Sequence, residues 1–328
     1  MKSRRLIPSA ELPDSLWRKE AKCILLPPNL VSVWQQLLEA EGLLEKAQQP
    51  TPENLIGGGS KEVTDDHLTW RFTGSSARVQ MAMLDPLDNL DLVADAFAKT
   101  FAGGRVFLAD LPCGSGAAVL TILCTIAELR KTRRIPRSPL YLTVLGGELS
   151  EFARAYAHKG IGGLVESLQT EGIFVDADFL HWNACDKFSN ADLIKELTLR
   201  SAGCGARMLV LANFSGFLQS SGKWDAARAQ FDALFLHSRD ENSCAIWIEP
   251  LTNNVIKTGG GFFDRLINWF KKQFGELPQT MSLVGEEKQP IYGASEAHAQ
   301  HPLRPDHSFR SNLAVVRFDL PKEMAGKG

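Results

Sequence analysis

The feature that most constrains this chain is a repeated alternation of strand-like and helix-like segments that begins near residue 104. Short apolar, β-rich runs predict strands at 106–110, 140–145, 173–180, 208–212, 244–248 and 313–318. Apolar residues at helical spacing predict helices at 117–131, around 152–156, and at 191–200, 224–238 and 262–274. Strands and helices that alternate in this way form a mainly parallel sheet with helices on both faces.

Residues 1–103 lack this alternation. Apolar residues recur at helical spacing over 30–38 and again over 87–101, and turn-forming residues at 48–52 and 57–60 separate the two segments. We therefore expect a mainly helical N-terminal region, residues 1–103, that forms a cap or lid. It precedes an α/β domain of residues 104–328.

The composition is that of a soluble globular protein, and it removes several classes of function. With Lys+Arg 36 against Asp+Glu 38, the net charge is -2, so binding to nucleic acid is possible but not indicated by charge. The basic run 131–137 is expected to be a solvated loop away from the ligand. No apolar run of about 18 residues predicts a membrane span, and the N-terminus does not fit a signal peptide. Scattered cysteines without a CxxC pair indicate reduced thiols, so we expect a cytoplasmic protein.

The most informative motif is Asp110-Leu111-Pro112-Cys113-Gly114-Ser115-Gly116, between the strand at 106–110 and the following helix. Open α/β sheets bind ligands at this kind of junction, where glycines admit a close ligand and a helix N-terminus offers free N–H groups. A P-loop is disfavoured because no Lys follows Gly116. A dinucleotide fingerprint is weakened because Val119 stands where that motif has Gly or Ala.

The motif resembles the first motif of the class I, Rossmann-like S-adenosylmethionine (SAM)-dependent methyltransferases, roughly D-L-G-C-G-[ST]-G. Pro112 departs from it, since proline fixes φ and removes an N–H where the family usually has glycine. A second segment, Gly146-Gly147-Glu148-Leu149-Ser150, resembles the family's G-x-[DE]-h-S, with Leu149 at the apolar position h. A carboxylate at Glu148 can accept hydrogen bonds from both ribose hydroxyls.

We call the four candidate cofactor-binding positions that follow successive strands stations; the glycine-rich motif and Glu148 are the first two. Two further stations follow the next strands. Asn183 and Ala184 stand where the resembled family has an Asp-Ala type pair that meets the adenine, and an amide can still accept from an amino group. Asp186 could substitute for the missing carboxylate, or it is a plain loop residue. Asn213 closes the fourth strand and either contacts the amino-acid end of the cofactor or satisfies the turn. The stretch 213–216 is not the N-P-P-[YF] motif of amino-methylating enzymes, so the acceptor is not specified.

Other polar residues allow weaker inferences. Arg78 is a candidate to reach the SAM carboxylate from a lid, and Glu249 is either an acceptor-site carboxylate or a turn residue. His298, His301 and His307 have spacing that suggests metal ligation, but the surrounding prolines and polar residues predict a loop. We therefore expect no metal.

The resemblance covers roughly residues 104–320 and implies a seven-stranded sheet with its last strand antiparallel. It also implies SAM as cofactor and methyltransferase activity toward an acceptor of unknown class, whether small molecule, protein or RNA. Alignment alone can supply about 7–11 kcal/mol of the barrier to methyl transfer, so no catalytic residue is named. Two alternatives stay open: a Rossmann-type NAD-binding enzyme, and a non-catalytic binding or assembly module, which the departures at Pro112 and Asn183 keep open.

Overall fold

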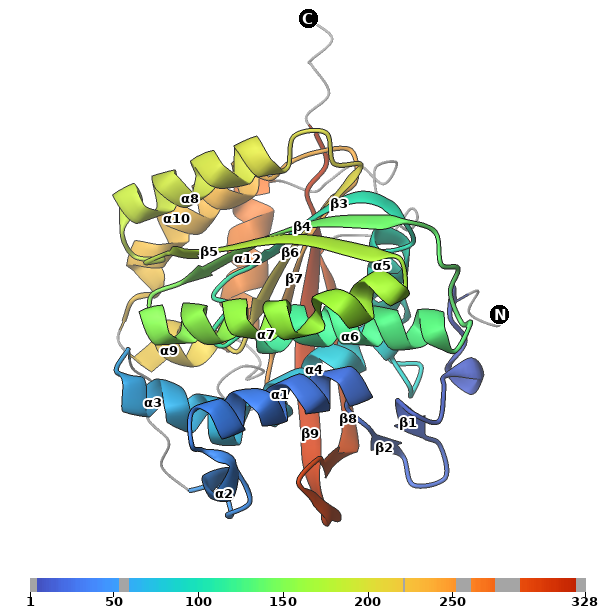
Figure 1. Ribbon diagram of the computed structural model, residues 1–328. Helices are drawn as coiled ribbons and strands as arrows, with labels where there is room; N and C mark the ends of the chain where they lie inside the picture. Colours follow the sequence, from blue (N-terminus) through green and yellow to red (C-terminus); the bar gives the residue numbers. More distant parts are fainter. Residues whose placement is uncertain (1–4, 53–58, 221, 252–260, 275–289, 323–328) are drawn as a thin grey trace, which may run out of the picture.

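The computed structural model describes residues 5–52, 59–220, 222–251, 261–274 and 290–322. These residues form one mixed sheet with helices on both faces (Figure 1). Along the sheet the strands follow the order β1-β2-β8-β9-β7-β6-β3-β4-β5. The predicted α/β class is therefore confirmed.

Five parallel strands form the middle and one edge of the sheet. They are β3 (Gly104–Asp110), β4 (Leu140–Glu148), β5 (Ile173–His181), β6 (Ala206–Ala212) and β7 (Ser243–Glu249). The inner strands are apolar runs because helices bury them on both faces. Since the five strands are parallel, their carboxyl ends meet at one edge, where the residues singled out from the sequence lie.

The chain closes with a hairpin of β8 (Ile291–His301) and β9 (Arg304–Asp319), and β9 runs antiparallel to both β7 and β8. An antiparallel last strand is what the resemblance implies. The expected count of seven strands is wrong, because β1 (Trp17–Arg18) and β2 (Cys23–Ile24) extend the same sheet. Cys23 pairs with His298 of β8, so the sheet formed by the described residues has nine strands.

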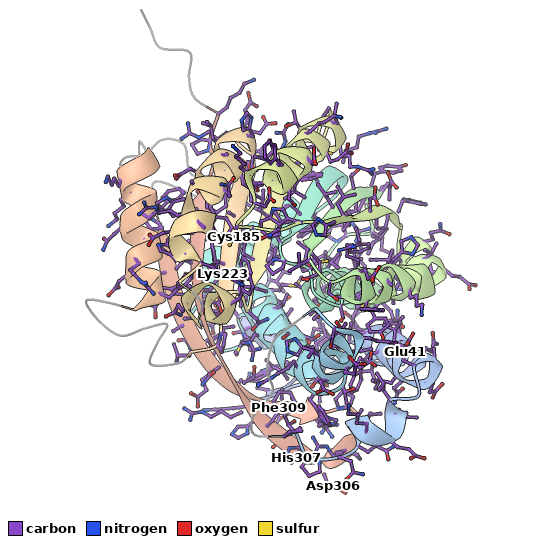
Figure 2. The ribbon with its side chains drawn as sticks, turned by 90° about the vertical axis from the view of Figure 1, so that its left-hand side faces the viewer. Glu41, Cys185, Lys223, Asp306, His307 and Phe309 are labelled. Carbon is purple, nitrogen blue, oxygen red and sulfur yellow. The ribbon has the colours of Figure 1, made fainter. Side chains whose placement is uncertain are left out.

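The three C-terminal histidines lie on this hairpin, so the predicted loop is wrong. His298 is exposed and His301 is buried, because residues three apart on a strand point to opposite faces. Burial lowers the pKa of His301 to about 4, and its ring meets Trp34 edge-on. His307 lies at the end of the hairpin, far from Cys185 (Figure 2). Among the described residues, no group of three or more His, Cys, Asp or Glu side chains could hold a metal ion.

Helices cover the sheet in two layers (Figure 1). One layer holds α4 (Phe72–Leu84), α6 (Ala117–Lys131) and α7 (Glu151–Thr170), with α1 (Pro28–Ala40) packed outside α6 and α7. The other holds α8 (Lys187–Arg200), α10 (Trp224–His237) and α12 (Phe262–Phe274). The shorter helical segments are η1 (Ser9–Glu11), α2 (Leu44–Ala47), α3 (Lys61–Asp66), the π-helical η2 (His67–Arg71), α5 (Asp91–Thr100) and α9 (Ser215–Ser220).

Packing joins the N-terminal region to the sheet. α4 lies against α6, and one hydrophobic cluster contains Trp34 and Val79 together with Val106 and Leu120. α1 approaches α7 closely at Gly163, where an added Cβ would lie 2.7 Å from a methyl group of Val33. Within the described residues, no helix combines the length and apolarity that crossing a membrane requires.

Candidate functional site

The loop between β3 and α6 contains the glycine-rich motif. Gly114 has φ +50° and Gly116 has φ +84°, both in the left-handed region that favours glycine, and the Leu111–Pro112 bond is cis. The Cys113 N–H donates to the carbonyl of Gly147 at 3.0 Å, which attaches the loop to the end of β4. The first and second stations of the sequence motif therefore lie side by side.

The two glycines of this loop have different surroundings. A Cβ on Gly116 would lie 3.1 Å from Cα of Ala157, so α7 packs directly against the loop. A Cβ on Gly114 would meet no atom within 4 Å. The backbone at Gly114 is therefore open to a ligand, whereas Gly116 serves close packing.

Glu148 connects the two stations through its carboxylate. Its Oε2 accepts the N–H of Gly114 at 3.1 Å, and its Oε1 accepts the N–H of Ser150 at 2.9 Å. A carboxylate has about four lone-pair positions, so two backbone bonds leave capacity for further donors. Leu149 beside it is 47% exposed, an unusual value for a large apolar residue at the edge of a buried sheet.

Asp110 lies beneath the loop and is only 1% exposed. Its Oδ2 accepts the N–H of Val119 at 3.1 Å, while its Oδ1 is buried without a hydrogen-bond partner. Burial raises the pKa of this carboxyl to about 8, and the nearby charge of Glu148 adds to the increase. The Oδ1 of Asp110 can therefore still take part in a hydrogen bond at the centre of the loop.

The station after β5 is built by local turns. The Asn183 Oδ1 accepts the N–H of Cys185 at 3.0 Å, and Ala184 is buried. The Asp186 Oδ1 accepts the N–H groups of Phe188 at 2.8 Å and Ser189 at 3.2 Å. Asp186 is therefore the N-cap of α8, and the structure favours the plain structural interpretation for it.

The station after β6 includes a residue from the N-terminal region. The Arg78 Nε, on α4, donates to Oδ1 of Asn213 at 2.9 Å. Burial lowers the pKa of Arg78 to about 10, and the negative charge of Glu249 partly offsets that effect. Arg78 thus lies at the carboxyl edge of the sheet, beside the fourth station.

Glu249 at the end of β7 accepts hydrogen bonds from the turn that follows β6 and so stabilises this station. Its Oε1 accepts the N–H groups of Phe214 at 2.9 Å and Ser215 at 2.8 Å, and also the indole N–H of Trp247 at 2.7 Å. Glu249 is 1% exposed, and burial raises its pKa. Of the two roles considered for Glu249, the structure shows the turn-stabilising one.

A polar cluster above α7 was not anticipated from the sequence. The Tyr156 hydroxyl donates to Oδ1 of Asp65 at 2.5 Å and accepts from Nζ of Lys61 at 3.0 Å. Glu41 forms ion pairs with Lys61 at 3.1 Å and with Lys159 at 2.7 Å, and its position is marked in Figure 2. These residues come from three separate segments, so no local pattern reveals them.

This cluster fixes α3 over the start of α7. The Thr64 Oγ1 lies 3.0 Å from Oγ of Ser150, the residue that caps α7 and whose N–H binds Glu148. The π-helical segment η2 follows α3 directly, and such segments are frequent at functional sites. Part of the N-terminal region therefore lies next to the second station.

The strand order and the antiparallel β9 decide the fold. This is the fold of the class I methyltransferases. No family model and no curated protein matches the chain. The solved structures that resemble it include the small RNA methyltransferase HEN1, with 12% identity and TM-score 0.36 over 70% of this chain and 25% of that chain.

Two further similar structures have different acceptors in their names. One is the precorrin-6y C5,15-methyltransferase from Geobacter metallireducens, with 7% identity and TM-score 0.33 over 69% of this chain and 86% of that chain. The other is a geranyl diphosphate methyltransferase in complex with GPP and sinefungin, with 10% identity and TM-score 0.32 over 89% of this chain and 99% of that chain.

Proposed function

We propose that this protein binds SAM at the carboxyl ends of β3, β4 and β5 and transfers its methyl group to an acceptor. The observation that carries the proposal is the junction of Gly114 and Glu148, where a glycine backbone open to solvent and a carboxylate meet at 3.1 Å. Parallel α/β sheets bind nucleoside-containing ligands at such an edge. A nucleoside there would face an open glycine backbone and a carboxylate that has spare lone pairs.

The residues present fit the parts of the cofactor. The open backbone at Gly114 would hold the methionine part, and the spare lone pairs of Glu148 would accept the ribose hydroxyls. The exposed Leu149 offers an apolar surface to the adenine ring, and Asn183 with Ala184 would lie at its edge. Arg78 beside Asn213 provides the cation for the methionine carboxylate.

When bound, SAM would supply a methyl group on a positively charged sulfur: an acceptor nucleophile in line with the C–S bond takes the methyl carbon as that bond breaks, and S-adenosylhomocysteine is the leaving group. The protein's task is to orient the two reactants and keep water away, which requires no dedicated acid or base. In our proposal residues 1–103 take part in this enclosure as a lid or acceptor-selecting surface. Thr64 and Lys61 already attach α3 to the start of α7, next to Glu148.

Titration calorimetry with SAM, S-adenosylhomocysteine and NAD tests the binding step. We expect SAM and S-adenosylhomocysteine to give heat of binding and NAD to give none. We expect Glu148→Ala to abolish the heat of binding of SAM and S-adenosylhomocysteine. Glu166→Ala is the matched control, because Glu166 is an exposed carboxylate on α7. Binding of NAD instead of SAM, or an unchanged affinity in Glu148→Ala, would contradict the proposal.

Transfer is tested separately from binding. Incubation of the protein with methyl-labelled SAM and a cell extract should move label into an acceptor, and Glu148→Ala should not. SAM binding without any transfer would support the alternative of a non-catalytic module with the same fold.

A further inference from the structure

Strand β5 lies at one end of the sheet, so one of its edges has no neighbouring strand among the residues that the structure describes. The N–H of Leu140 on β4 donates to the carbonyl of Gly172 at 3.0 Å, just before β5 begins. In a parallel pair every second residue of a strand bonds to the neighbouring strand, so Val175 and Ala177 direct their N–H and C=O groups away from β4. The backbone of β5 is therefore open to a further strand at these two residues.

A cavity of about 480 Å³ lies beside this edge, between β5 and α8, and Figure 1 shows α8 running above β5. The side chains of Val175 and Ala177 pack against the hydrophobic cluster on the α7 face of the sheet. The even-numbered side chains of β5 therefore point to the α8 face, where Asp178 and Leu180 line the cavity. From α8 the lining includes Asp192, Lys195 and Glu196. We call this cavity and the adjacent free edge of β5 the β5–α8 groove.

Two large apolar side chains stay exposed beside the groove. Phe174 is 41% exposed and lies on the same face of β5 as Asp178, four residues before it. Leu199 is 60% exposed and follows Lys195 by four residues, which places it on the same side of α8 as the lining. Exposed apolar side chains that are rimmed by polar residues indicate a contact surface for a partner.

Carboxylates are in excess along the groove. Arg200 forms ion pairs with Asp178 at 2.6 Å and with Glu196 at 3.2 Å, so two acidic groups share one cation. Asp176 and Asp192 are exposed, and within the described part of the chain neither forms an ion pair. The free edge of β5 is therefore bordered by unneutralised negative charge.

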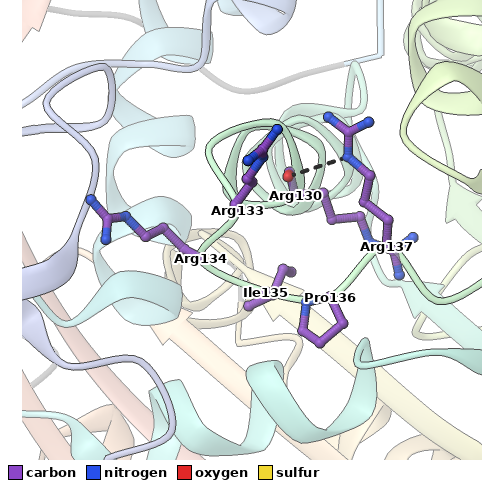
Figure 3. A pocket seen from close by; sticks show the side chains of 6 residues that line it. All are labelled: Arg130, Arg133, Arg134, Ile135, Pro136 and Arg137. Atoms are coloured by element: carbon purple, nitrogen blue, oxygen red, sulfur yellow. Dashed lines mark hydrogen bonds between the residues drawn. The ribbon is translucent and has the colours of Figure 1, made fainter.

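The positive charges nearby do not cancel this excess. Besides Arg200, the basic side chains in the lining are Lys195 and His181, and Lys195 adds one full charge. The arginine-lined cavity of Figure 3 follows α6 and lies on the opposite face of the sheet, with α6 and α7. One of its arginines, Arg137, is paired with Glu171 at 2.9 Å. The groove therefore suits a partner with cationic side chains.

We propose that the β5–α8 groove binds an extended basic segment of a partner protein, which adds to the sheet as a strand beside β5. Peptides that add to a sheet edge gain affinity from main-chain hydrogen bonds and specificity from alternate side chains that enter neighbouring pockets. Here the main-chain bonds form at Val175 and Ala177. Every second side chain of the segment then lies on the α8 face, against the carboxylates of the groove.

A second copy of the chain fits this edge less well. Antiparallel pairing of two copies centred on Ala177 places Asp176 of one copy opposite Asp178 of the other. Pairing centred on Asp176 places that carboxylate opposite its own equivalent. Like charges directly opposite each other destabilise a strand pair, whereas opposite charges stabilise it. The same carboxylates therefore disfavour self-association and favour a basic segment.

This inference goes beyond the proposed function and does not depend on SAM. Glu148 bonds to the Gly114 loop and to Ser150 at the start of α7, whereas the groove lies on the α8 face of the sheet. Glu148→Ala should therefore abolish SAM binding and leave binding at the groove unchanged. Loss of one activity without the other identifies which of the two proposals fails.

Fluorescence anisotropy of the full chain with a labelled nine-residue peptide of alternating lysine and valine tests the groove. We expect the peptide to bind at about 50 mM salt and to bind more weakly as salt screens the charges. A second peptide, in which proline replaces every valine, keeps the lysines but lacks the N–H groups that a strand pair needs. We expect the proline peptide not to bind.

Two variants separate the charges from the strand edge. Asp176→Asn with Asp192→Asn should weaken binding by up to about fivefold for each lost charge pair, and less at high salt. Ala177→Pro should abolish binding, because it removes an outward N–H from an edge strand without removing a hydrogen bond to β4. Circular dichroism and urea midpoints would show that both variants fold. The proline peptide tests strand pairing even where Ala177→Pro does not fold.

Glu39→Gln with Glu166→Gln is the matched control for charge. Both carboxylates are exposed, but they lie on α1 and α7, which cover the opposite face of the sheet. We expect this control to bind the lysine–valine peptide like the unmodified protein. Weakening equal to that of the Asp176 and Asp192 variant would overturn the proposal.

Three other outcomes would also overturn it. The lysine–valine peptide does not bind at about 50 mM salt. The proline peptide binds as tightly as the lysine–valine peptide, which would indicate attraction between charges without strand pairing. Light scattering shows a dimer that Ala177→Pro dissociates, which would assign the edge of β5 to a second copy of the chain.

Discussion

Gly116 shows how one residue limits the geometry of the candidate site. It combines φ +84° with a neighbouring helix so close that a Cβ would lie 3.1 Å from Ala157. Gly116→Ala should lower the free energy of unfolding by about 2 kcal/mol, from the left-handed backbone and the forced contact together. Gly42→Ala is the control, because Gly42 has φ +70° but would meet no atom within 4 Å. Urea unfolding of both variants separates the two costs, and equal losses would contradict the packing role.

Asp110 predicts a dependence of stability on pH. Its pKa is raised by burial to about 8 in the folded protein, against about 3.9 in an unfolded chain, so the folded state holds an extra proton between these values. Its contribution is therefore fully present below pH 4 and is lost as the pH rises through 8. Asp110→Asn keeps an acceptor for the Val119 N–H but cannot ionise.

The measurement is the free energy of unfolding in urea at pH 5 and pH 8. Between these values the unmodified protein should lose more stability than Asp110→Asn does. An identical loss in the two proteins would show that the carboxyl at position 110 does not titrate in this range.

At the scale of elements, the attachment of α3 to α7 depends on the Tyr156 hydroxyl. This group is buried and bonded to Asp65 and Lys61, and removing a hydrogen bond to a charged group costs about 1.5–3 kcal/mol. Tyr156→Phe should therefore increase hydrogen exchange over residues 61–66 while the exchange of β3 stays slow. Tyr141→Phe is the control, because Tyr141 is exposed. Unchanged exchange in α3 would mean that the ion pairs of Glu41 and the Thr64–Ser150 contact hold α3 without the Tyr156 hydroxyl.

The elements that the sequence predicted are those whose apolar residues recur with a clear period. The helix expected at 117–131 coincides with α6, and the β-rich runs became β3 to β7, because alternating apolar segments have one stable arrangement. α4 was missed: it is buried on nearly all sides, and its small and polar residues give no apolar stripe. β1 and β2 were missed because two-residue strands depend on pairing with β8, which lies far along the chain.

The same distinction applies to the candidate site. The loop at Gly114 and the carboxylate of Glu148 were visible because each follows a strand that the pattern predicts, and the structure brings them together. The separate roles of Asp186 and Glu249 could not be read from the sequence. Each depends on which N–H groups a turn presents, and that is a tertiary property.

At the scale of the whole molecule, we expect the hydrophobic cluster to make the N-terminal region and the sheet unfold together. The cluster joins Trp34, Leu68 and Val79 to Val106 and Leu120, so exposing either part opens apolar surface on the other. Scanning calorimetry should show a single transition whose calorimetric and van't Hoff enthalpies agree. Val33→Ala, at the contact with Gly163, should lower the midpoint without splitting the transition. Two resolved transitions would instead identify residues 1–103 as an independent unit, which would then be free to open as a lid without disturbing the cofactor edge.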